Sequence, residues 1–217
     1  RRRGTGILTS DAPLIISISG IRGLVGRSLT ADVVRRFAAA YGGLLAPGSR
    51  VLLARDTRPS GEDLARAAAD GLQATGCNGV DLGMCSSPAA KMMVVELGAE
   101  AGIILTASHN PAPWNGLKLI RGDGVFLNHT QGTQVESAYH ADDAVQRSGG
   151  RIEHITRDEV EDRYLDRVLS AVDVDLIRDA SLRVAADPCN GAGALFLHRL
   201  FDRLGVTATI INDEPNG

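Results

Sequence analysis

Short apolar runs alternate with segments of helical periodicity along most of this chain, and this alternation constrains the fold more than any other feature. The runs at 14–18, 51–54, 79–84 and 101–105 have the length of buried strands, and the intervening segments repeat apolar residues at helical spacing. Strands alternating with helices favour a sheet with right-handed crossover connections. We therefore expect an α/β fold, a mixed, mainly parallel sheet with helices on both faces.

Capping residues predict where the helices begin. Thr30 predicts the start of one helix, Ser60 with Asp63 resembles the capping box of a second, and Ser87 predicts the start of a third. The segment Gly20–Gly26 carries a glycine at every third position. We expect this segment to be a loop.

The pattern divides the chain into four parts. Residues 1–12 are expected to be a disordered leader, 13–150 a first domain, and 151–180 a connecting helix. Residues 181–217 restart the pattern with one strand–helix–strand unit. Because so small a unit cannot bury both faces of its sheet, we expect the truncated start of a second, similar domain, or one completed by other chains.

Charge and cysteine content exclude several classes of function. A net charge of −3 and a pI near 6.0 give no basic field for nucleic acid or an anionic membrane, so a phosphate ligand must be held by local groups. Three cysteines without C-x-x-C spacing favour free thiols in a reducing compartment. We expect a cytoplasmic protein that binds neither nucleic acid nor membrane, and the sequence leaves a homo-oligomer open.

The stretch Leu105–Lys118 is the strongest candidate for chemistry. Ser108 follows the buried run 101–105, and ligands of open α/β sheets bind at the carboxyl ends of strands. Two prolines and the Asn115-Gly116 turn signal then reverse the chain. Lys118 on the returning strand is therefore expected near Ser108.

Two further polar groups follow strands. The Gly20–Gly26 segment fits neither the dinucleotide fingerprint nor a P-loop, and its Arg22 is either a solvated turn residue or a ligand contact. For Arg55, Asp56 and Arg58 we favour a local ion pair that braces the loop over direct substrate contact. Both assignments stay open at this stage.

Phosphoryl transfer is the reaction type that suits these residues best. An esterase is disfavoured because G-x-S-x-G is missing and because neighbouring side chains of extended backbone, such as Ser108 and His109, point to opposite faces. An enzyme that catalyses phosphoryl transfer mainly has to position the reacting groups and stabilise the charge of the transferring phosphoryl group. Ser108 offers an acceptor oxygen, and Lys118, His109 and Arg22 offer cationic donors.

Two other motifs are read as structural. Asp173 and Asp175 imitate a D-x-D-x-D metal loop, but the third aspartate is missing and the segment looks like the end of a helix. Asn190–Gly193 lacks the third glycine of a dinucleotide loop. We therefore expect no magnesium site at 173–175 and a tight strand-to-helix turn at 190–193.

Four ordered motifs resemble the α-D-phosphohexomutases, the family of phosphoglucomutase, phosphomannomutase and phosphoglucosamine mutase. Thr106–Pro111, followed by Trp114–Lys118, closely resembles the family's phosphoserine signature. Ser19–Gly23 looks like its amino-terminal substrate loop, Arg55–Gly61 like its second loop, and Asp187–Gly193 like the opening of its second domain. The resemblance covers nearly the whole chain.

The resemblance implies a mechanism and site residues. Ser108 would be carried as phosphoserine, give its phosphoryl group to a hexose or hexosamine phosphate, and take one back from a sugar 1,6-bisphosphate intermediate. The net reaction interconverts 1-phosphate and 6-phosphate. Lys118 would be the general acid or base, Arg22 and His109 would assist in substrate binding and catalysis, and the Ser108 phosphate would supply one ligand to Mg²⁺.

The resemblance also sets limits on the chain. The family's aspartate metal loop, sugar-specificity loop and phosphate-binding loop are absent from these 217 residues. We therefore expect an amino-terminal portion that is inactive alone, and the identity of the hexose stays open. The alternative hypothesis is a catalytically silent module of the same fold that binds sugar phosphate or mediates assembly.

Overall fold

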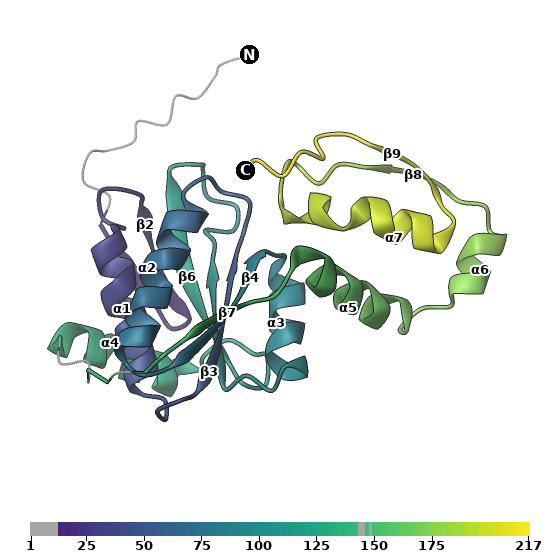
Figure 1. The fold of residues 1–217 in the computed structure, drawn as a ribbon. Helices are drawn as coiled ribbons and strands as arrows, with labels where there is room; N and C mark the ends of the chain where they lie inside the picture. The colour runs from purple at the N-terminus through teal and green to yellow at the C-terminus, as the bar shows by residue number, and fades with distance from the viewer. Residues whose placement is uncertain (1–12, 143–145, 148) are drawn as a thin grey trace, which may run out of the picture.

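A seven-stranded mixed sheet forms the centre of the larger unit in the computed structural model, which describes residues 13–142, 146–147 and 149–217 (Figure 1). The expected leader, 1–12, lies outside the described residues. Across the sheet the strands follow the order β1-β2-β6-β5-β3-β4-β7. Their bounds are Ile15–Ser17 (β1), Gly20–Leu24 (β2), Arg50–Arg55 (β3), Asn78–Met84 (β4), Ala101–Leu105 (β5), Trp114–Arg121 (β6) and Ile152–His154 (β7).

The sheet is parallel in one half and antiparallel in the other. Strands β5, β3, β4 and β7 pair in parallel, whereas β6, β2 and β1 pair antiparallel with their neighbours. The change of direction falls between β5 and β6, because the chain reverses there instead of crossing over. The expected mixed α/β sheet is confirmed, and the reversal sits at the stretch that carries Ser108.

Helices cover both faces of the sheet, as expected (Figure 1). On one face lie α1 (Ala31–Gly43), α2 (Gly61–Ala74) and α4 (His129–Ala141), and on the other α3 (Ser87–Glu96) and α5 (Arg157–Leu169). Strand β5 is buried along its whole length, with Ile103 in one core and Ile104 in the other. Because successive strand residues point to opposite faces, a strand covered on both sides must be apolar throughout.

The prediction of a loop at Gly20–Gly26 is wrong for most of this segment, because residues 20–24 form strand β2. The glycines allow the backbones to approach closely: a Cβ on Gly20, at φ +140°, would lie 1.8 Å from the Leu117 carbonyl oxygen. Likewise, a Cβ on Gly116 would lie 2.4 Å from the carbonyl oxygen of Ile21. Gly20 therefore serves close strand contact, whereas Gly26, at φ +75° with nothing within 4 Å of a new Cβ, lies in a turn after the strand.

All three helices begin within one residue of the predicted start, but only one of the three predicted side-chain caps forms. Thr30 caps α1 by accepting a hydrogen bond from the Val33 amide at 3.3 Å, as predicted. The cap of α3 is Ser86, one residue before the predicted Ser87. Ser60 has helical backbone angles and does not cap α2 with its side chain. Its hydroxyl oxygen accepts instead from the side-chain amide of Asn115 at 2.9 Å.

Residues 151–180 hold more than the expected connecting helix. They contain β7, which pairs with β4 and extends the first sheet beyond residue 150, then α5 and a short helix α6 (Val174–Asp179). Asp173 caps α6 by accepting from the Leu176 amide, so the 173–175 segment begins a helix instead of ending one. No helix in the described ranges has both the length and the apolar character that a membrane span requires.

The last part of the chain forms one parallel strand–helix–strand unit, as expected. Strands β8 (Arg183–Ala186) and β9 (Thr207–Ile210) pair in parallel, joined by a 3₁₀ turn, η1 (Ala192–Leu195), and by α7 (Leu197–Leu204). No residue of β8 or β9 is fully buried. The small unit thus leaves its sheet partly uncovered, in agreement with the physical expectation for its size.

Candidate active site

Ser108 lies in the turn between β5 and β6, in the left-handed backbone region at φ +55°. For a residue other than glycine this conformation costs on the order of 1–3 kcal/mol, and it persists only where the surroundings enforce it. Two hydrogen bonds within the turn stabilise it. The Ser108 amide donates to the Thr106 hydroxyl at 3.1 Å, and the Asn110 amide donates to the Ala107 carbonyl at 3.1 Å. The serine is thus presented at the carboxyl end of β5 on a strained, ordered turn.

All four predicted site residues line one cavity of about 310 Å³: Arg22, Ser108, His109 and Lys118. Sheet register brings them together, since β2 pairs with β6 so that Gly20 faces Lys118 and Arg22 faces Gly116. Arg22 is the exposed residue of an otherwise buried strand. The sequence analysis grouped Lys118, His109 and Arg22 around Ser108, and the four residues do line one cavity.

Lys118 is held in the middle of the sheet, between β5 and β2. It faces Ile104 on one side and Gly20 on the other, and it is only partly exposed. Its ammonium nitrogen lies 5.5 Å from the centre of the Phe126 ring, within the range of a cation–π contact. Lys118 is therefore fixed at the cavity wall and is not a freely solvated strand lysine.

Ser108 and His109 lie closer together than the sequence suggested. The Ser108 Oγ and His109 Nδ1 atoms are 3.5 Å apart, at the limit of a hydrogen bond. The expectation that they point to opposite faces was wrong, because Ser108 adopts a left-handed and not an extended conformation. Within the described part of the chain no carboxylate pairs with His109, so these residues do not form the oriented serine–histidine–carboxylate set of a hydrolase.

A second cavity, of about 360 Å³, lies on the other side of Ser108. It is bounded by the 56–58 segment of the first unit and by Cys189 and Gly191 of the second. The two units also touch directly, because the Thr57 hydroxyl donates to the Asn190 carbonyl at 3.1 Å. Ser108 therefore faces the boundary between the two units.

Residues 187–191 turn the chain from β8 into the 3₁₀ turn η1, where the sequence predicted a tight strand-to-helix turn at 190–193. Cys189 and Asn190 both have positive φ, at 53° and 56°. The Asp187 carboxylate accepts hydrogen bonds from the Cys189 amide at 2.8 Å and from the Asn212 side chain at 3.0 Å. These hydrogen bonds hold the pKa of Asp187 below its ordinary value.

Asn115 is a structural residue that the sequence interpretation missed. Its dipeptide with Gly116 was taken as a turn signal, yet both residues lie inside β6 and Asn115 is fully buried. Its side-chain oxygen accepts from the Gly116 amide, and its nitrogen donates to Ser60. The partner is 55 positions away, so no local sequence signal could have identified it.

The described residues fit only part of a magnesium site. They contain no group of three or more histidine, cysteine, aspartate or glutamate side chains arranged to hold a metal ion. One buried oxygen, Oδ1 of Asn110, lacks a hydrogen-bond partner in the described part of the chain, but a single amide oxygen does not make a Mg²⁺ site.

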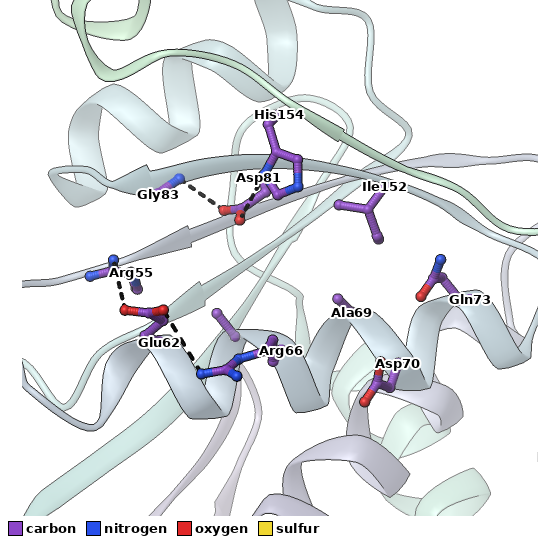
Figure 2. A pocket seen from close by; sticks show the side chains of 11 residues that line it. Arg55, Glu62, Arg66, Ala69, Asp70, Gln73, Asp81, Gly83, Ile152 and His154 are labelled. Carbon is purple, nitrogen blue, oxygen red and sulfur yellow. Dashed lines mark hydrogen bonds and ion pairs between the residues drawn. The ribbon is translucent and has the colours of Figure 1, made fainter.

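A larger cavity, of about 460 Å³, lies elsewhere on the first unit and contains none of the four predicted residues (Figure 2). Most of its charged side chains pair with one another, and Asp70 adds a further carboxylate. Glu62 lies 4.0 Å from Arg55 and 3.8 Å from Arg66, and Asp81 lies 3.4 Å from His154. Because these charges offset each other, the cavity lacks the convergent cations that a phosphate ligand needs. The Ser108 cavity is the better candidate site.

Comparison with known proteins assigns the family. The family description phosphoglucomutase/phosphomannomutase, alpha/beta/alpha domain I, matches residues 15–146, and domain II of the same family matches residues 162–217. The chain belongs to the phosphoglucomutase/phosphomannomutase family. The resemblance seen in the four sequence motifs is thereby confirmed.

Individual members of the family show similar levels of identity. A phosphoglucomutase/phosphomannomutase of Thermococcus kodakarensis is 32% identical over 202 residues, which cover 91% of this chain and 44% of that protein. A phosphoglucosamine mutase of Rubrobacter xylanophilus is 34% identical over 212 residues, covering 95% and 46%. The chain thus spans about half the length of the curated relatives it matches.

A solved structure supports the fold. The crystal structure of a phosphoglucomutase/phosphomannomutase family protein from Burkholderia thailandensis superimposes with a TM-score of 0.75 at 28% identity, covering 93% of this chain and 45% of that one. The mixed first sheet followed by the start of a second α/β domain is therefore the arrangement of this family.

Proposed function

We propose that the protein containing this chain interconverts the 1-phosphate and 6-phosphate of a hexose or hexosamine, with Ser108 as the phosphoryl carrier. One observation carries the proposal: Ser108 stands on a strained turn in a cavity that also receives Arg22, His109 and Lys118. The names of the relatives, which include phosphomannomutase and phosphoglucosamine mutase activities, support the same reaction class.

The chemistry assigned to these residues balances without a further co-reactant. In the first transfer, the bond between phosphorus and the Ser108 oxygen breaks as phosphorus bonds to a sugar hydroxyl oxygen. For this step Lys118 acts as the neutral amine: it accepts the proton of the attacking sugar hydroxyl and passes it to the leaving serine oxygen, so that Ser108 ends as a neutral hydroxyl. The second transfer runs the other way, from a sugar 1,6-bisphosphate to Ser108. Arg22 and His109 bind phosphate oxygens and offset the negative charge of the transferring group.

Magnesium remains an expectation drawn from the resemblance. A phosphate on Ser108 supplies one oxygen ligand, and the described side chains do not complete the set. The described residues supply the proposed phosphoryl carrier, Ser108, and the cationic side chains around it. Because the chain spans about half the length of its relatives, turnover by these 217 residues alone is not expected.

The test is phosphorylation of Ser108 itself. Intact mass and peptide mapping after incubation with a hexose 1,6-bisphosphate and Mg²⁺ should show one phosphate on the Ser108 peptide, and S108A should remain unmodified. K118M should slow the transfer about 10²- to 10⁴-fold, the usual contribution of a positioned acid or base. A phosphate found only on other residues would contradict the proposal, and binding of the sugar phosphate without transfer would favour a silent binding module.

A further inference from the structure

One guanidinium holds the turn that carries Ser108. Arg58 follows β3, its side chain is only 10% exposed, and its Nε atom lies 3.2 Å from a carboxylate oxygen of Asp56. Its four remaining N–H groups donate to four backbone carbonyls of the β5–β6 turn. The acceptors, with their distances, are Ser108 (3.1 Å), Asn110 (2.7 Å), Pro111 (3.1 Å) and Trp114 (3.0 Å).

The hydrogen bonds use the full donor capacity of the arginine. A guanidinium has five N–H groups in a fixed planar fork, and all five have acceptors here. A lysine ammonium has three donors on one atom and cannot span the same four carbonyls. Asp56 fixes the fork at its base, because its other carboxylate oxygen accepts from the Arg58 amide at 3.0 Å.

The contacts act where the backbone needs support. Ser108 is held at φ +55°, a conformation that relaxes unless its surroundings enforce it. Arg58 binds the carbonyl of Ser108 and that of Asn110, two residues later, so it fixes the carbonyl side of Ser108, while the Thr106 hydroxyl holds the Ser108 amide. The guanidinium also places a positive charge against the residue proposed to carry the phosphate.

We infer that Arg58 is a positioning residue for phosphoryl transfer: it acts through the backbone of the serine turn and holds Ser108 Oγ in line with the substrate. All five N–H groups of the guanidinium already have acceptors within the protein, so none is left to bind the substrate directly. The inference rests on the proposed function for its catalytic consequence, while the ordering of the turn can be tested without it.

The experiment compares R58M and R58K with R50M in the intact protein. Arg50 is the matched control because it lies at the other end of β3 and also donates to a backbone carbonyl, that of Leu97, at 2.8 Å. We expect R58M to lower the rate constant for Ser108 phosphorylation by sugar bisphosphate about 10²-fold, the effect of a misplaced reacting group, with R58K only partly restoring it. The half-saturating bisphosphate concentration should stay near that of the wild type, because substrate contacts are intact. R50M should match the wild type.

Hydrogen–deuterium exchange of residues 106–116 provides a readout that does not depend on catalysis. Faster exchange there in R58M, with unchanged protection in β3 and β5, supports the inference. Wild-type rate and wild-type exchange in both Arg58 variants would overturn it. If wild-type Ser108 accepts no phosphate, the proposed function fails and the exchange result alone decides the role of Arg58. If R58M does not fold, R58K decides by the same two measurements.

Discussion

At the scale of single residues, one cavity is lined by two residues with positive φ, one from each unit. Ser108 on the first unit and Cys189 on the second have φ values of 55° and 53°, and both line the cavity of about 360 Å³. The other two cysteines, Cys77 and Cys85, are buried, and all three are free thiols, as the sequence predicted. Alkylation of the exposed Cys189 thiol can therefore be used to probe the surroundings of the candidate site.

Thiol reactivity should separate the three cysteines. The nearby Asp187 carboxylate raises the pKa of Cys189, and burial raises the pKa of Cys85 to about 12. Because the thiolate is the reactive form, alkylation of Cys189 should be slow at pH 7 and faster as the pH rises, with Cys77 and Cys85 protected by burial. Peptide mapping after timed alkylation measures this order.

D187N should accelerate alkylation of Cys189 several-fold at pH 8, because the substitution removes the charge that disfavours the thiolate. The control is D213N, whose carboxylate pairs with His198 and not with the 189 region. Equal rates in wild type and D187N would show that the carboxylate does not govern this thiol.

At the scale of elements, close contact between β2 and β6 builds the cavity floor. Gly20 faces Lys118 across the two strands, and its missing side chain leaves room for the carbonyl of Leu117. Gly20 therefore acts through strand packing, and Arg22 reaches the site because β2 runs beside β6.

G20A should destabilise the protein by about 2–4 kcal/mol, since the new Cβ both overpacks the strand contact and strains a backbone at φ +140°. The control is G48A, where φ is +82° but no atom lies within 4 Å of the new Cβ. That variant should lose only about 1 kcal/mol from backbone strain. Urea unfolding midpoints at equal m-values measure both, and a G20A midpoint no lower than that of G48A would refute the packing explanation.

At the scale of the whole molecule, α5 joins the two units (Figure 1). One side packs on α3 through Val160, in the second core of the sheet. The other side contacts the second unit, where the ring centres of Tyr164 and Phe196 lie 5.2 Å apart in an edge-on arrangement. Arg199 of α7 also forms ion pairs with Asp162 and with Glu161, whose side chain is 8% exposed. The orientation of the second unit beside Ser108 therefore depends on α5.

R199M should weaken this attachment by about 1–3 kcal/mol, because it removes charged hydrogen bonds to a mostly buried carboxylate. R203M, one turn later on α7, removes only an exposed pair with Asp166 and should cost less than about 1 kcal/mol. Calorimetry should show a low-temperature shoulder or a lowered transition in R199M. Identical melting of both variants would mean that the buried pair does not hold the units together.

The sequence by itself determined most of the strands and helices and the family of the chain. Apolar runs such as Ala101–Leu105 are buried on both faces because their neighbours on either side are helices, and a local pattern suffices to show this. Thr30 could be predicted as a cap because capping depends on residues three apart. Ser108 and Lys118 were identified from a strand end and a chain reversal.

Only the tertiary structure decided how these parts meet. That Gly20–Leu24 is a strand depends on β6, nearly a hundred residues away. Asn115 bonds Ser60, 55 positions away, and Arg58 bonds carbonyls that are 50 or more positions away. The left-handed turn of Ser108 likewise accepts hydrogen bonds from an arginine 50 positions away. Propensity and spacing describe interactions between near neighbours, whereas register and long-range hydrogen bonds are fixed when the whole sheet assembles.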